Sequence, residues 1–557
     1  MTARRSFPGT TLGGYAARAC IAAGVVLLSL ASGTALAGQT QAQTPSGGVE
    51  FPVSCSAEAQ AEFTRGVVQL HHMTYPRARE SFDNAARIDA RCAMAHWGIA
   101  MTLFQPLWPT RPSPPDLRRG WEAVQSARTV GTRSERERVL IEAVAAFFED
   151  PESTDYWQRI RRWEAAMSSA HDAFPHDPEV TAFFALSHMA AAPTDDKSVA
   201  AHSERAAALL LGVYERNPNH PGAMHYLVHA NDAPGREHSS LDITEKYEST
   251  APRNPHALHM PTHIYTRLGD WSAVIRGNLL AAEAALANPA GDRGQFIWDE
   301  FPHAVEYLVY AYLQQGADDK AQAQLVRLQQ SRALQPSFKT AFHLASTQAR
   351  YVLERRDWSA AAAVVPRSFA GLEWDAFAWP EAVSWFARGL GMAHTGRTTE
   401  ADEAIKRLNA LEATARGAGE ELWARNIHIL SLDVQAWLAH ARGDSGSSLA
   451  LVREAAEMEL ATPKHPVTPA PTIPAPELQG DLLLASDNPA GALQAYRRSL
   501  ELYPRRFNSL LGAARAARGA GDAASARQHY RALLDAAGEG SRRAELDEAR
   551  TFLASRG

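Results

Sequence analysis

Several features are scarce in this 557-residue sequence, and each scarcity excludes a class of protein. Lysine and arginine number 56 against 62 acidic residues, so the chain lacks the basic excess that a nucleic-acid partner requires. After the N-terminal region, no apolar run approaches the roughly 18 residues of a membrane span. Residues that favour β-strands are sparse, and no G-x-S-x-G elbow, P-loop or dinucleotide fingerprint occurs. We therefore expect a helical protein with no nucleic-acid partner, no membrane span in the mature chain and no identifiable nucleophile.

The first 37 residues have the pattern of a secretory signal peptide. They contain Arg4, Arg5 and Arg18, no acidic residue, the apolar run "CIAAGVVLLSLA" and the small-residue ending "TALA". This order indicates cleavage after Ala37 rather than a membrane span. The pair Arg4-Arg5 resembles a twin-arginine signal, so that route and ordinary secretion both stay open. Cleavage would leave 53 basic and 62 acidic residues, a net charge of −9, in a periplasmic or secreted protein.

Cysteine is also scarce, with three residues in the whole chain. Cys20 leaves with the signal peptide, and its context "AARAC" is a poor lipid-attachment site. Cys55 and Cys92 remain as an even pair in an oxidising compartment, which favours a disulfide between them. The alternative is two free buried thiols.

Alanine, leucine, arginine and glutamate dominate at helical spacing, and part of the pattern repeats. Ala492 and Tyr496 recur 34 residues later as Ala526 and Tyr530. This is the period and residue pattern of tetratricopeptide repeats, in which a small alanine lets two antiparallel helices approach closely. "RLGDW", "ARGDS" and "GAGDA" each place glycine at a helix end and aspartate at the next helix start. The sequence predicts an all-α solenoid of tetratricopeptide-type helical hairpins in a right-handed superhelix.

Composition divides the chain into segments. Six prolines lie between Thr462 and Pro476. We expect that stretch to lack helix and to run over the surface as a semi-rigid connector, with its apolar Val467 and Ile473 able to pack on the solenoid. The expected segments, in chain order, are a signal peptide (1–37), a flexible N-terminal segment (38–54), a degenerate solenoid (55–461), the Pro-rich connector (462–476), two C-terminal repeats (477–537) and a capping helix (538–557).

Histidine is unusually concentrated in one stretch of the chain. Six of the 21 histidines fall between His225 and Trp271. His225 and His229, at i and i+4, lie on one face of a predicted helix. His256, His259 and His263 fall within about 60° of each other on a second predicted helix, and each of these helices would be the first of its repeat pair. A third such helix adds a histidine and a glutamate at i, i+3. The candidate metal ligands are His225, His229, His256, His259, His263, His303, Asp232 and Glu306, with His71 and His96 as possible additional groove residues.

These imidazoles and carboxylates form a donor set that suits a borderline metal ion. Zn²⁺ or Cu²⁺ fits best, whereas Ca²⁺ and Mg²⁺ prefer oxygen ligands alone. Tyr226 stands where a metalloprotease motif would have glutamate, and Pro261 can kink the second histidine helix. The alternative is a structural polar network without any cofactor, although each buried neutral ring then needs a hydrogen-bond partner.

Several stretches resemble secreted bacterial tetratricopeptide-repeat proteins. They include "GAMHYLVHANDAP", "PHALHMPTHIYTRLGDW" and "HPVTPAPTIPAPELQGDLLL", and the likeness covers most of residues 50–535. Glu306 stands where the pattern of that group has aspartate. The resemblance implies the fold, the compartment and first helices that line a concave groove, but no established activity.

Two classes of function follow from these observations. One is an extracytoplasmic binding protein whose groove receives a protein or peptide, or a metal-bound small molecule. The other is a metal-dependent enzyme with hydrolytic or oxidative chemistry on the same solenoid.

Overall fold

The structure is a computed structural model. It describes residues 48–153, 155–193, 196–291 and 293–555, so the expected signal peptide lies outside the described residues. No helix in these ranges has the length and hydropathy of a membrane span. Isolated bridges are the only β pairing found there.

Apart from a 3-10 turn at Trp374–Ala376, the regular elements are α-helices. Their bounds are α1 (Ala57–His71), α2 (Tyr75–Ile88), α3 (Ala93–Met101), α4 (Pro114–Val130), α5 (Glu135–Phe148), α6 (Tyr156–Ala173), α7 (Pro178–Ala190), α8 (Asp196–Arg216), α9 (Pro221–Asn231), α10 (Leu241–Glu248), α11 (Pro255–His259), α12 (Pro261–Leu268), α13 (Trp271–Leu286), α14 (Glu300–Gln314), α15 (Asp318–Gln330), α16 (Phe338–Glu354), α17 (Trp358–Ala362), α18 (Ala378–His394), α19 (Thr398–Gly417), α20 (Glu421–Ala441), α21 (Ser445–Leu460), α22 (Ala475–Ala485), α23 (Pro489–Leu502), α24 (Phe507–Gly519), α25 (Ala523–Ala536) and α26 (Ala544–Ala554).

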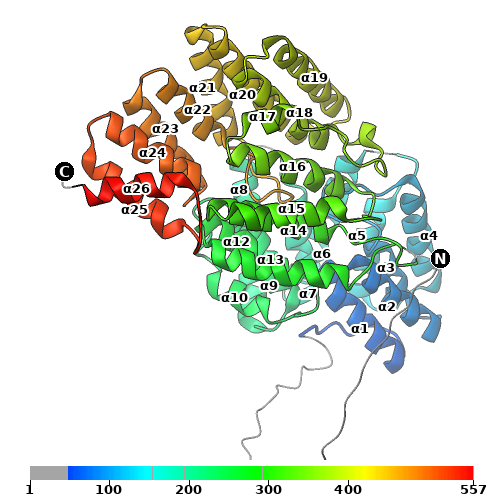
Figure 1. Cartoon of the computed structure of the whole chain (residues 1–557). Coiled ribbons are helices and arrows are strands. Elements are labelled where there is room, and N and C mark those ends of the chain that lie inside the picture. The colour runs from blue at the N-terminus through cyan, green and yellow to red at the C-terminus, as the bar shows by residue number, and fades with distance from the viewer. Residues whose placement is uncertain (1–47, 154, 194–195, 292, 556–557) are drawn as a thin grey trace, which may run out of the picture. The chain divides into compact units, whose positions relative to one another are not determined.

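Consecutive helices pair as hairpins, and first helices of neighbouring hairpins contact each other, as α14, α16, α18 and α20 do (Figure 1). The turns have the expected chemistry. Gly269 ends α12 with a φ of 67°, a left-handed conformation that glycine adopts without strain. Asp270 then caps α13 by accepting a hydrogen bond from the Ala273 amide. The prediction of an all-α solenoid of helical hairpins is confirmed.

Aromatic side chains on second helices fill gaps beside glycines on first helices. A Cβ atom added at Gly66 or Gly98 would lie 2.6 or 2.3 Å from the ring of Phe82, which α2 carries between α1 and α3. Tyr496 on α23 fills the same kind of space, where a Cβ at Gly512 would lie 2.3 Å from its ring. The hairpin packing is therefore of tetratricopeptide type at both ends of the solenoid.

The N-terminal segment is tied to the second hairpin by a disulfide. Cys55 and Cys92 are bonded, with their Cα atoms 4.8 Å apart. Cys92 is the N-cap residue of α3, so the bond links the chain before α1 to the start of that helix.

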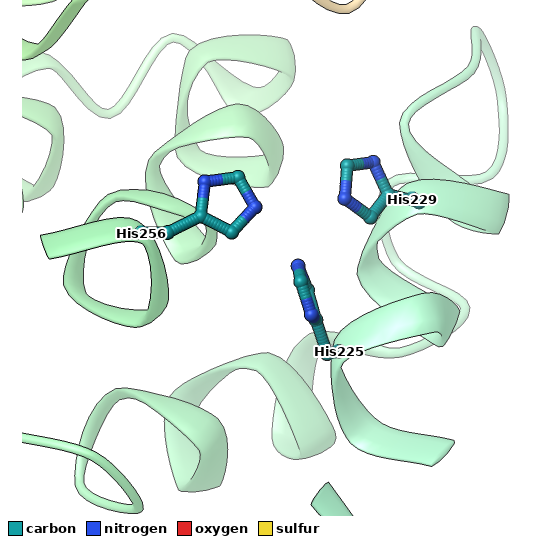
Figure 2. Close-up of side chains that lie close together, drawn as sticks. All are labelled: His225, His229 and His256. Atoms are coloured by element: carbon teal, nitrogen blue, oxygen red, sulfur yellow. The ribbon is translucent and has the colours of Figure 1, made fainter. Parts of the chain in front are cut away.

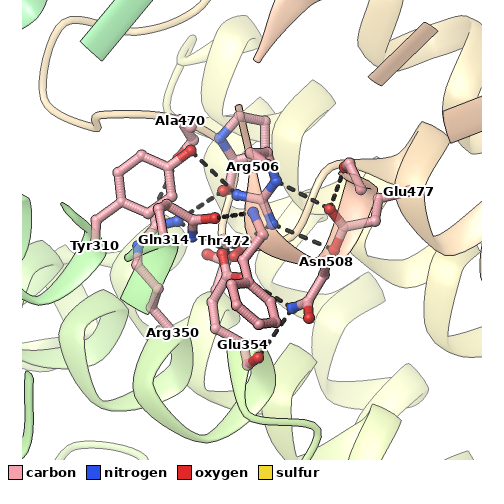
Figure 3. Close-up of polar contacts among 12 residues, drawn as sticks. Tyr310, Gln314, Arg350, Glu354, Ala470, Thr472, Glu477, Arg506 and Asn508 are labelled. Atoms are coloured by element: carbon pink, nitrogen blue, oxygen red, sulfur yellow. Dashed lines mark hydrogen bonds and ion pairs between the residues drawn. The ribbon is translucent and has the colours of Figure 1, made fainter. Parts of the chain in front are cut away.

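The Pro-rich connector contains no helix before Ala475, but it does not run over the surface. Val467 and Ile473 are 3% and 1% exposed. Arg350 of α16 donates hydrogen bonds to the backbone oxygens of Ala470, Pro471 and Thr472 (Figure 3). Of the two expected placements, the structure shows packing on the solenoid through Val467 and Ile473 and not a path over the surface, because these apolar side chains and the carbonyl groups find partners against the first helices.

A buried charge network holds the C-terminal repeats against the central helices. Arg506 lies 2.8 Å from Glu354 of α16 and 3.0 Å from Glu477 of α22, and it donates to the Tyr310 hydroxyl of α14 (Figure 3). All three charged side chains are at most 1% exposed. Buried charged and polar side chains therefore join the start of α24 to α14, α16 and α22.

Candidate metal centre

The histidines of the central stretch lie on first helices of neighbouring hairpins. His220 caps α9, since its Nδ1 accepts the Ala223 amide, and α9 then presents His225 and His229 one turn apart. The next first helix is split into α11 and α12, because Pro261 has no amide to donate. His256 and His259 therefore lie on α11, and His263 lies on α12.

The first histidine group consists of His225, His229 and His256, whose rings turn toward one another (Figure 2). One ring nitrogen from each lies within 4.8 Å of the others. His225 Nδ1 is 2.6 Å from the His71 carbonyl, so it carries the proton and leaves Nε2 as an acceptor. His256 Nδ1 lies 3.3 Å from Glu300 Oε1, without hydrogen-bond alignment. The three Nε2 atoms of the group have no hydrogen-bond partner in the structure.

The second histidine group consists of His259, His263 and His303, again with one nitrogen each inside 4.8 Å. His259 Nδ1 donates to Asn278 Oδ1 at 2.7 Å, and His263 Nδ1 donates to Asp232 Oδ2 at 2.8 Å. The NH₂ group of Asn278 donates to the Thr262 hydroxyl and the Val274 carbonyl, so its Oδ1 is the atom that faces His259. Both Nε2 atoms must therefore carry lone pairs, yet they lie only 2.9 Å apart.

The tautomer of His303 is fixed by a relay of two side chains. Glu306 accepts from His343 Nδ1 at 2.5 Å, so His343 Nε2 is an acceptor. His303 Nδ1 lies 2.9 Å from that atom and donates to it. His303 Nε2 is then the third lone pair of the second group. The Tyr307 hydroxyl, 3.3 Å from His263 Nε2, is one donor that faces these lone pairs. The close pair of acceptors on His259 and His263 still lacks a proton between them, and a metal ion would fill that place.

Burial of the three imidazoles disfavours an added proton. It lowers the pKa values of His259 and His303 well below 6.5 and lowers that of His263, although Asp232 partly opposes the shift there. His225 and His229 are lowered well below 6.5 by burial in the same way. Neutral imidazole is the form that ligates a metal.

A small cavity of about 20 Å³ touches both groups. Its lining includes His229 and His256 of the first group, His263 and His303 of the second, and the buried Lys339. A single water molecule needs about 10–15 Å³ by this kind of measure. There is thus room for one small ligand next to both groups.

A third cluster, of His71, Glu179 and His220, turns ring protons rather than lone pairs toward its centre, and its His220 Nε2–Glu179 Oε1 contact lacks hydrogen-bond alignment. His71 Nε2 lies 2.7 Å from one oxygen of Glu179, and His220 Nε2 lies 3.2 Å from the other. Because His220 Nδ1 accepts an amide and His71 Nδ1 faces the Tyr226 hydroxyl, both Nε2 atoms carry protons toward the carboxylate. No lone pairs converge in this cluster, so it needs no metal ion.

The structure brings the six predicted histidines together and places the other predicted residues outside the two histidine groups. The six expected histidines form two adjacent groups rather than one. Asp232 and Glu306 lie behind the groups as acceptors for His263 and His343. His71 belongs to the cluster with Glu179 and His220, and its backbone carbonyl accepts a hydrogen bond from His225 Nδ1. His96 lies beside Asp83 and belongs to no group found among the described residues.

Sequence reasoning missed four residues of this region, His343, Asn278, Glu300 and Lys339. His343 had a usable signal, since it lies on the first helix that follows the one carrying His303. The other three carry no pattern that separates them from ordinary helix residues.

No protein-family model matches this chain, and no curated protein matches it either. Among solved structures, the human IFIT1 dimer with PPP-AAAA is 12% identical, covering 87% of this chain and 95% of that one, with a TM-score of 0.38. The APC/C hetero-tetramer Cut9–Hcn1 is 13% identical, covering 89% and 90%, with a TM-score of 0.29. Likenesses at TM-scores below 0.5 support no argument about this chain's function.

Proposed function

We propose that this protein is an extracytoplasmic helical-repeat protein that binds transition-metal ions, one at each histidine group. The observation that carries the proposal is the pair of lone-pair nitrogens of His259 and His263, 2.9 Å apart in a buried site. In tetrahedral zinc coordination, ligand nitrogens about 2.0–2.1 Å from the ion lie roughly 3–4 Å from each other. A small adjustment of the two rings would admit the ion.

Each group offers three imidazoles, which suits Zn²⁺ or Cu²⁺. The ring nitrogens opposite the ligating ones are held by the His71 carbonyl, Asn278, Asp232 and His343. Such outer partners fix ring orientation and raise the basicity of the ligands.

A metal-dependent enzyme is the second candidate, and the small cavity between the groups favours it. Three protein ligands leave a coordination position open, as catalytic zinc sites do. A metal ion there would supply Lewis-acid chemistry, and Lys339 on the cavity wall would hold positive charge nearby.

The extracytoplasmic location is part of the proposal. It is supported by the signal-like pattern of residues 1–37 and by the disulfide between Cys55 and Cys92, since such bonds persist in oxidising compartments.

Metal analysis of the full chain, purified without a histidine tag and equilibrated with Zn²⁺ or Cu²⁺, tests the proposal. We expect about two ions per chain. The double variant H225A/H229A should lose one ion, and H259A/H303A should lose the other. H238A is the matched control, because His238 belongs to the same histidine-rich stretch but is exposed. Full metal content in both double variants, or none in the wild type, would leave only the metal-free scaffold.

A further inference from the structure

A second and much larger cavity of about 400 Å³ lies beside the first histidine group. His229 lines both cavities, so the large one adjoins the candidate metal position. Its volume lies within the range typical of small-molecule sites. The Pro-rich connector supplies part of its wall, including Lys464.

Charged side chains around this cavity give it a positive balance. Four basic residues line it, Arg111, Arg236, Arg267 and Lys464. Three acidic residues line it, Asp232, Glu420 and Glu459. Burial raises the pKa of Glu459 to about 8, so this carboxyl is mostly neutral near pH 7. With Glu204, which pairs with Arg236 at 3.6 Å from outside the wall, three carboxylates face four cations, an excess of one positive charge that favours an anionic ligand.

Two of the cations keep donors for such a ligand. Lys464 Nζ contacts Asp232 Oδ2 at 2.9 Å and donates to the Thr468 carbonyl at 3.1 Å, which leaves one N–H. Arg267 binds Asp232 through Nε and Nη2, and no hydrogen bond within the described residues uses its Nη1. Asp232 therefore orients both cations at the edge of the cavity nearest His263.

Aromatic rings form much of the remaining wall. Trp108, Trp157, Trp423 and Tyr503 line the cavity. The guanidinium of Arg111 lies 5.1 Å from the Trp157 ring centroid and 5.7 Å from that of Trp423. Planar rings and cations together suit a flat, aromatic anion, because the ring stacks while the charge is paired.

We propose that the large cavity binds a small aromatic carboxylate, its carboxylate on Lys464 and Arg267 and its ring against the tryptophans. The inference deepens the proposed function, on which it rests only in placing the ligand beside a metal ion at His229. A carboxylate oxygen that also reaches this ion would strengthen the binding in the metal-loaded protein.

Calorimetry with 2-naphthoate on the full chain, both metal-free and zinc-loaded, tests this site. We expect binding in both forms, tighter in the zinc-loaded one. The neutral 2-naphthamide should bind about tenfold more weakly, because it cannot pair with the cations. K464M should lower the naphthoate affinity by a similar factor, and W157A should lower it through loss of ring contact. K406M, at an exposed lysine, is the matched control and should bind as the wild type does.

Equal binding of the acid and the amide, or no loss in both K464M and W157A, would overturn the ligand assignment. Naphthoate binding by a protein that takes up no zinc when zinc is supplied would contradict the proposed function and leave the anion site standing. Two bound zinc ions without naphthoate binding would support the proposed function and contradict the anion site. The two proposals therefore fail separately.

Discussion

Replacing Arg506 with methionine measures how strongly the C-terminal repeats are locked to the central helices. The guanidinium is fully buried and pairs with Glu354 and Glu477, which are 1% and 0% exposed on their side chains. Methionine fills similar space but leaves two buried carboxylates without their main partner. Removing one member of a buried ion pair costs about 3–5 kcal/mol. We expect R506M to lose that much free energy of unfolding near pH 7.

The pH dependence of this loss gives a second measure of the same network. Burial raises the pKa of Glu477, but Arg506 and Arg356 together more than offset this effect, and the net pKa is lowered from 4.5. The stability that this carboxylate contributes is present above about pH 4.5 and is lost as the pH falls through the folded-state pKa. The cost of R506M should therefore shrink in acid, where the carboxyls become neutral.

Urea unfolding of the full chain at several pH values provides the assay. R515M is the control, since Arg515 belongs to the same repeats but pairs with Glu548 while 43% exposed on its side chain. An exposed pair of this kind contributes about 1 kcal/mol or less. A cost for R506M no larger than that of R515M, or one that does not change with pH, would refute the reasoning.

Three further predictions concern other parts of the fold. Ala492 and Ala526 are fully buried, so leucine at either position should overpack its hairpin and lower the unfolding free energy by about 1–3 kcal/mol in urea titrations. Serine at both Cys55 and Cys92 should destabilise the chain by about 4 kcal/mol, given their separation of 37 residues. Because the folded-state pKa of Glu459 is raised to about 8, stability should fall between about pH 4.5 and 8 by a few kcal/mol. E459Q should remove most of this slope in melts across that range.

The repeat architecture was predictable because its signals are local. Glycine followed by aspartate marks a helix end and the next cap within two residues, as at Gly269 and Asp270. The spacing of Ala492 and Tyr496 encodes contact between adjacent helices, which a short window of sequence contains. The partners that bury the connector's backbone were not predictable from local sequence signals. They include Arg350, which lies more than one hundred residues earlier in the chain and meets three connector carbonyls.

The histidine site was predictable in part for the same reason. Helical phase put His225 and His229 on one face, and the structure retains that arrangement. Phase within a helix does not determine which ring meets which across helices. His259 and His263 join His303 of α14 across the helix break at Pro261, while His256, on the same helix as His259, joins the α9 pair.

What distinguishes a metal site from a polar network is the balance of donors and acceptors. A neutral imidazole brings one of each. In the cluster of His71, Glu179 and His220, one carboxylate faces two N–H groups, so a negative charge and not a set of lone pairs meets the ring protons. Around His259 and His263, Asn278 and Asp232 take the ring N–H groups outward, and the Tyr307 hydroxyl offers a single proton to the inward nitrogen of His263. A count of histidines in the sequence cannot separate these cases, because the decisive atoms belong to the partners. The deficit of protons at the second histidine group is the physical reason to expect a cation there.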